Sequence, residues 1–126
     1  VQLVAQLALA RALYATLGQA FRIPSGAMAP TIRIGDYLMV APLRRPPRRD
    51  EVVSFRDERG QFIQRVAGLP GDTLAMVDGA LRRNGRPVAE PWRHLDPESG
   101  VARAELEWGP TVVPRDSVFL LGDNRG

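Results

Sequence analysis

The stretch FRIPSGAMAPTIRIGDYLMV, residues 21–40, decides how this chain folds. Pro24 and Pro30 enclose a Ser-Gly-Ala-Met turn, and a Gly-Asp corner at 35–36 leads into an apolar segment. Proline fixes φ, and glycine permits backbone angles that are closed to other residues, so residues 24–30 should form a rigid, sharply turned segment. Such a turn holds its backbone N–H groups in fixed positions. On the residues alone, it could also be an ordinary corner between two strands.

The composition predicts one mostly β domain. The chain has 126 residues, 12 of them Gly and 11 Pro, and 44% of its residues are apolar. This length is sufficient to bury a core without disulfides or metals, and so many turn-forming residues favour short strands over a helical bundle. We therefore expect antiparallel strands joined by Gly/Pro-rich turns.

The charged residues and the missing residue types exclude several kinds of chemistry. All 17 basic residues are Arg, so the chain has no Lys that could serve as a general base. It has no Cys, and His94 is its only His, which argues against a metal site or a Ser-His-Asp triad, and no cofactor is expected. The net charge is only +3, and no aromatic residues interleave the arginines at 44–49. We expect a solvated loop there and no nucleic-acid partner.

Residues 1–20 are predicted to form a helix, because they are rich in good helix formers. Arg11 and three polar residues interrupt its apolar surface, so its composition is poor for a membrane span. Two interpretations remain open: the remnant of a membrane anchor, or an amphipathic helix that packs on the domain or on a partner.

The rest of the chain, residues 21–126, is predicted to be the β domain. A small hairpin and loop excursion is expected at 78–110, in which Asn84-Gly85 is the strongest hairpin signal and 89–110 is irregular. Period-two alternation on the segment 61–67 places Gln64 among apolar neighbours. Seven strands are expected, at residues 37–41, 51–56, 61–67, 73–77, 80–83, 111–113 and 118–121.

Three segments of the chain resemble the conserved boxes of the type I signal peptidases. Residues 21–40 resemble the nucleophile box, usually Pro-Ser-Gly-Ser-Met-x-Pro-Thr-Leu followed by Gly-Asp and an apolar strand. The run FIQRVAGLPGD at 62–72 resembles the general-base box, usually Tyr-Ile-Lys-Arg-x-x-Gly-x-Pro-Gly-Asp. Residues 122–125, Gly-Asp-Asn-Arg, resemble the start of the last box. That box continues further in the family, so we expect that the printed chain stops inside it.

The resemblance implies a catalytic position for three residues. Ala27 stands where the family has its nucleophilic serine, and Gln64 stands where it has its lysine base. Ser25 matches the serine of the oxyanion hole. An alanine has no oxygen with which to attack, and a carboxamide is not basic near neutral pH, so no peptidase activity is expected.

The resemblance also assigns two larger sets of residues. The positions expected to line shallow substrate pockets, or to form plain core, are Phe21, Ile23, Pro24, Met28, Ile32, Phe62 and Ile63. The structural positions of the boxes are Arg65, Gly71, Asp72, Gly122, Asp123, Asn124 and Arg125.

The expected function follows from this resemblance. Family enzymes cut signal peptides from secreted preproteins with a Ser-Lys dyad; this chain is expected to keep the peptide groove without the cleavage, either as a natural pseudoenzyme or as an engineered inactive mutant. The resemblance implies membrane association, through residues 1–20 or a segment upstream of them, with the domain on the extracytoplasmic side. The alternative is a non-catalytic interaction domain that binds a partner through residues 1–20 or the arginine loop.

Overall fold

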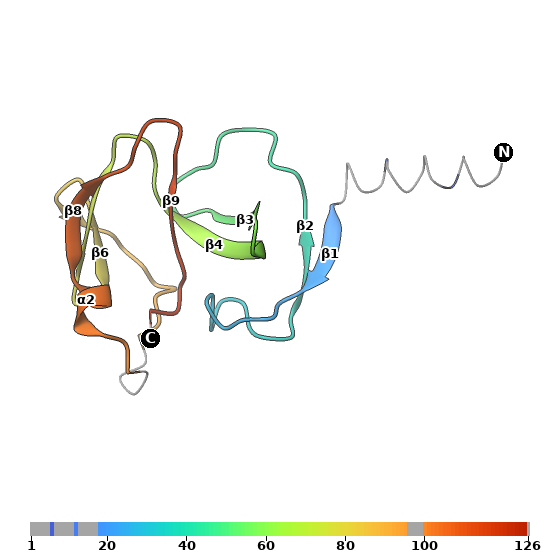
Figure 1. Ribbon diagram of the computed structural model, residues 1–126, viewed down its shortest axis with the longest axis horizontal. Coiled ribbons are helices and arrows are strands. Elements are labelled where there is room, and N and C mark those ends of the chain that lie inside the picture. The colour runs from blue at the N-terminus through green and yellow to red at the C-terminus, as the bar shows by residue number, and fades with distance from the viewer. Residues whose placement is uncertain (1–5, 7–11, 13–17, 96–99, 126) are drawn as a thin grey trace.

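The computed structural model describes residues 6, 12, 18–95 and 100–125 (Figure 1). These residues form three antiparallel β-sheets, which confirms the predicted mostly β fold. The helix predicted for residues 1–20 falls almost entirely outside the described residues. Within the described ranges, no helix is long and apolar enough to cross a membrane.

The first sheet is a hairpin of β1 (Gln19–Arg22) and β2 (Tyr37–Val40), and it corrects the end of the predicted helix. Gln19 and Ala20 are strand residues, paired with Val40 and Met39. Gly18 precedes them with φ +83, and a Cβ there would collide with the carbonyl of Val40. Helix propensity therefore gives way to cross-strand pairing at the point where glycine permits a close approach.

The second sheet has the order β3-β4-β9 and lies in the middle of the molecule in Figure 1. Its strands are β3 (Val52–Asp57), β4 (Gly60–Gly68) and β9 (Phe119–Leu121). β3 pairs with β4 over its whole length, whereas β9 pairs only with Arg65, Val66 and Gly68. The first half of β4 is thus paired on one side only within the described residues.

The third sheet has the order β7-β6-β5-β8 and includes much of the predicted excursion. Its strands are β5 (Thr73–Val77), β6 (Ala80–Arg83), β7 (Arg86–Pro87) and β8 (Trp108–Val112). Asn84 and Gly85 both have positive φ, as the predicted hairpin turn requires. The segment expected to be irregular also holds a short helix, α2 (Arg103–Leu106), and the start of β8.

A hydrophobic core joins the second and third sheets. Leu74 of β5 and Leu81 of β6 are fully buried, and they pack with Ala67 of β4 and Val113. Partly buried residues complete this cluster: Val88, Trp108, Phe119 and Leu121. The core fixes the second half of β4, so the first half, which is paired only with β3, extends from a rigid base toward the β1–β2 hairpin.

Candidate functional site

The proline-braced segment between β1 and β2 folds into a compact turn. Ile23 N–H donates to the Asp36 carbonyl at 2.8 Å, and Gly35 N–H donates to the Ile23 carbonyl at 2.9 Å. Within the turn, Ile32 N–H donates to the Met28 carbonyl at 2.9 Å. Ile23 and Met28 are buried and anchor the turn, while Ala27 between them is exposed.

This turn and the first half of β4 enclose a pocket of about 130 Å³. The pocket brings Ala27, Gln64 and Ser25 together, although Ala27 and Gln64 are far apart in the sequence. Every residue that the sequence placed at a catalytic or substrate position lines it. Its lining residues are Phe21, Ile23, Pro24, Ser25, Ala27, Met28, Ile32, Gln61, Phe62, Ile63 and Gln64. The roles of these residues stay predictions, but their grouping is a property of the structure.

One edge of this pocket is an unpaired strand edge. Val66 N–H donates to the Glu51 carbonyl and the Val66 carbonyl accepts from Asp50 N–H, both at 2.8 Å, so the backbone groups of Val66 point toward β3. Backbone groups alternate along a strand, so those of Gln61 and Ile63 point away from β3. β9 pairs with β4 only from Arg65 onward. Among the described residues, no strand therefore takes up the N–H and C=O groups of Gln61 and Ile63.

A buried carboxylate holds the pocket walls together. Asp123 is 0% exposed and accepts two hydrogen bonds from Arg65, both at 2.8 Å, and one from Thr31 Oγ1 at 2.6 Å. The Arg65 guanidinium also donates to the Asp50 carbonyl at 2.8 Å and stacks on the ring of Trp92, 4.1 Å from its centroid. Asp123 thus connects three parts of the chain: the turn, β4 and the last segment, which is residues 122–125.

The last segment also holds the backbone at position 27. Asn124 N–H donates to the Ala27 carbonyl at 3.0 Å, and Asn124 Nδ2 donates to the Gly26 carbonyl at 3.1 Å. Gly122 packs so closely that a Cβ would collide with the Ala27 carbonyl oxygen. Asn124 and Gly122 therefore hold the peptide group between Ala27 and Met28 in place, while Ala27 itself is exposed.

Known proteins resemble the chain over most of its length. The family model described as "Signal peptidase, peptidase S26" matches residues 1–126. The chain belongs to this signal peptidase family. Signal peptidase I of Leptolyngbya laminosa is 34% identical over 86% of this chain and 57% of its own length, and the probable signal peptidase I-2 of Synechocystis is 32% identical over 98% and 58%. Signal peptidase I of Bacillus licheniformis is 31% identical over 98% of this chain and 70% of its own length.

The chain therefore spans a little more than half the length of the first two relatives. Within the described residues, no group of His, Cys, Asp and Glu side chains could hold a metal ion.

Arg125 secures the other side of the last segment. Its guanidinium pairs with Glu90 at 2.6 Å and donates to the Gly79 carbonyl at 3.0 Å, while its Nε donates to the Gly122 carbonyl at 3.0 Å. Both side chains of this ion pair are almost fully buried. Glu90 and Gly79 belong to the excursion at 78–110. This part of the chain therefore holds the last segment in place, and the last segment in turn holds the backbone of Ala27.

Asp72 performs a similar structural task at the end of the second box. It accepts two hydrogen bonds from Arg49, one from Leu69 N–H at 2.9 Å and one from Asn84 Nδ2 at 3.1 Å. Gly71 has φ +86 in the turn before it. The bonds from Arg49 lower the pKa of the Asp72 carboxyl far below its usual range; burial opposes this shift, and Leu69 N–H and Asn84 support it.

Four residues that contribute to the site were not predicted from the sequence. Thr31 and Trp92 brace Arg65 and Asp123, Glu90 pairs with Arg125, and Gln61 offers its backbone at the open edge. The contacts of Thr31, Trp92 and Glu90 form between segments that are far apart in the chain, so no local sequence pattern predicts them. The open edge at Gln61 follows from strand alternation only once the short reach of β9 is known.

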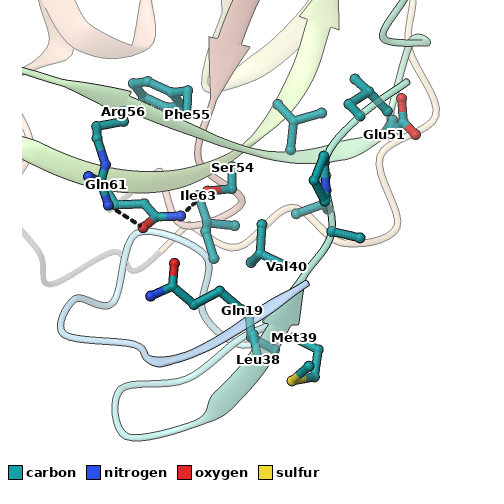
Figure 2. A pocket seen from close by; sticks show the side chains of 15 residues that line it. Gln19, Leu38, Met39, Val40, Glu51, Ser54, Phe55, Arg56, Gln61 and Ile63 are labelled. Carbon is teal, nitrogen blue, oxygen red and sulfur yellow. Dashed lines mark hydrogen bonds between the residues drawn. The ribbon is translucent and has the colours of Figure 1, made fainter. Parts of the chain in front are cut away.

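A second, larger pocket of about 440 Å³ lies between β2 and β3 (Figure 2). Val40 and Ile63 point toward each other across it, and Gln61 donates from Nε2 to Ser54 Oγ at 2.8 Å. The side chains of Gln61 and Ile63 thus lie in this second pocket, while their backbone groups face the first. β4 separates the two pockets.

The Asp123→Asn variant should unfold far more easily than the wild-type chain. Removing one partner of a buried ion pair typically costs about 3–5 kcal/mol, because the other charge stays buried without compensation. Urea denaturation at pH 7 measures the loss. The matched control is Asp57→Asn, whose pair with Arg59 is exposed and should contribute nothing measurable. Equal midpoints for the two variants would contradict this role of Asp123.

Asp72 should contribute stability that depends on pH. Its pKa is lower in the folded chain than in the unfolded chain, so the contribution is complete above about pH 4 and is lost as the pH falls toward the lower folded value. The variant Asp72→Asn should therefore be less stable at pH 7 by about 1–3 kcal/mol, with the difference shrinking below about pH 4. Urea midpoints measured from pH 7 to about pH 2 test this. A difference that stays constant would rule out the linkage.

Proposed function

We propose that this domain binds the signal peptides of secreted preproteins without cleaving them. The observation that carries the proposal is that Ala27 and Gln64, the positions of the family's nucleophile and base, line one pocket without supplying either group. Family membership supports signal-peptide-bearing preproteins as the ligands. The pocket supports a retained site, because its walls are braced by Asp123 and Asn124 rather than by the two missing groups.

The chemistry argues against cleavage. Acyl transfer by a Ser-Lys pair needs a hydroxyl oxygen and a neutral amine that takes its proton. The methyl group of Ala27 and the carboxamide of Gln64 supply neither. In the serine protease subtilisin, removal of the nucleophile or the base costs about 10⁶-fold in turnover. Ser25 lines the same pocket, but the chain has no Lys to activate its hydroxyl.

Strand addition is the binding mode that the pocket favours. An extended peptide can hydrogen-bond the outward-facing backbone groups of Gln61 and Ile63, as peptides do at the open edges of other sheets. Its alternate side chains would then enter the pocket between β4 and the proline-braced turn. The pocket is small, at about 130 Å³, which suits small peptide side chains.

The cellular setting is part of the same proposal. The family relationship supports membrane association, with this domain on the extracytoplasmic side where signal peptides emerge. Residues 1–20, or a segment upstream of them, are proposed to provide the attachment. The arginine loop is a weaker candidate for a partner site, since Arg45 and Arg49 are already paired with Glu51 and Asp72.

A titration with a fluorescently labelled signal peptide tests binding directly. Fluorescence anisotropy should rise with saturation on addition of the wild-type protein, and mass spectrometry should find the peptide intact after prolonged incubation. A scrambled peptide of the same composition serves as the control. Equal binding of the two peptides, or cleavage of the signal peptide, would contradict the proposal.

Restoring the two missing groups should restore some cleavage. The double variant Ala27→Ser/Gln64→Lys, tested in the full-length gene product, should release a fragment from a peptide with small residues one and three positions before the cut. Each single variant should stay inactive, because the hydroxyl and the amine act as a unit. Mass spectrometry of the products checks both points. An inactive double variant that still folds and binds peptide would show that the two positions are not held in a catalytic arrangement.

A further inference from the structure

Gln64 has a side-chain amide with no hydrogen-bond partner among the described residues. Its side chain is half-buried in the pocket that also contains Ala27, yet it forms no hydrogen bond within the part of the chain that the structure describes. Gln61, three residues earlier on the same strand, differs: its Nε2 donates to Ser54 at 2.8 Å, as Figure 2 shows. The Gln64 amide is therefore available to a ligand, and the Gln61 amide is already engaged.

A carboxamide that is covered without a partner is unfavourable. It carries two N–H donors and a carbonyl acceptor, and all of them bind water while the pocket is open. A peptide that covers the pocket displaces this water. An apolar peptide side chain would leave the amide without hydrogen bonds, whereas a side chain with its own donor and acceptor would replace the water.

The strand geometry brings one peptide side chain to Gln64. Side chains alternate along β4, so Phe62 and Gln64 share a face, opposite to that of Gln61 and Ile63. In a peptide strand paired at the open edge, the side chain beside Gln64 on the same face has its Cβ about 5 Å from that of Gln64. Ala27 contributes only a methyl group to the pocket, so it does not compete for the amide. The hydroxyl of Ser25, which also has no partner among the described residues, adds a second group of the same kind.

We propose that this groove selects extended peptides with serine, threonine or asparagine at the position facing Gln64, in preference to alanine. This inference rests on the proposed peptide-binding function and names the class of peptide. The pocket volume of about 130 Å³ equals roughly four groups of water size, at about 30 Å³ each. The side chains of serine, threonine and asparagine fit within it. Gln64 is thus proposed to be a specificity-determining residue. It stands where the family has its lysine, and this replacement changes which peptide side chain the site prefers.

The test uses a set of labelled octapeptides. All are alanine-rich extended sequences, with serine or asparagine placed at each position in turn and with the all-alanine peptide as the reference. For the wild-type protein, one position should show binding about tenfold tighter with serine or asparagine than with alanine, a factor typical of one satisfied hydrogen bond. Fluorescence anisotropy gives the dissociation constants.

Two variants locate the preference. Gln64→Met keeps the length of the side chain but removes the amide, so it should lose the serine preference and bind the alanine peptide at least as well. Gln19→Met makes the same change in the neighbouring pocket shown in Figure 2 and should keep the preference. Circular dichroism establishes that each variant is folded, and the wild-type comparison remains decisive if Gln64→Met does not fold.

The outcomes separate this inference from the proposed function. Binding of the serine, asparagine and alanine peptides within twofold of one another at every position overturns the selectivity while leaving peptide binding intact. A preference that survives in Gln64→Met overturns the role of Gln64. Failure of the wild-type protein to bind any peptide overturns both this inference and the proposed function.

Discussion

The arrangement of the site depends on the buried carboxylate of Asp123. Its partners are Arg65 from β4 and Thr31 from the proline-braced turn, and it comes from the last segment itself. Each of the three family boxes therefore supplies one member of a single hydrogen-bonded group. Burying a carboxylate is tolerable only when such partners surround it, so the three segments stabilise one another.

This interaction explains how the shape of the pocket can be independent of the side chains at positions 27 and 64. The hydroxyl and amine of an active family member would project into the pocket, whereas the groups that shape the pocket lie behind it. Asn124 fixes the Gly26 and Ala27 carbonyls, and Arg125 with Glu90 fixes the segment that carries Asn124. None of these bonds involves the side chain of residue 27 or 64. Replacing those two side chains leaves the bracing bonds in place and alters only the lining of the groove.

Local chemistry made most of the strands predictable, and competition between distant segments made the rest unpredictable. The turn at Asn84-Gly85 and the alternation in β3 and β4 are local signals, and the structure contains both elements. The predicted helix extended through Ala20 because propensity favours it, but pairing with β2 makes Gln19 and Ala20 a strand. The division into three sheets depends on long-range register, as does the short reach of β9 that leaves half of β4 open. The sequence contains no local signal for either.

The candidate site was predictable only in part. The residues of the pocket could be named from the resemblance to the signal peptidases, but nothing local in residues 21–40 or 62–72 indicates that they meet. The loop at 44–49 was expected to be solvated, and most of its residues are exposed, but Arg49 also reaches Asp72 and helps to hold the end of the second box. That partner lies 23 residues away.

The central claim is that the open edge of β4 receives the peptide, and amide hydrogen exchange measured with and without a bound signal peptide tests it most directly. The account predicts that the N–H groups of Gln61 and Ile63 become protected on binding, while those of Val52 and Ser54 on the opposite strand do not change. Protection at β3 or at the arginine loop, with Gln61 and Ile63 unaffected, would contradict it.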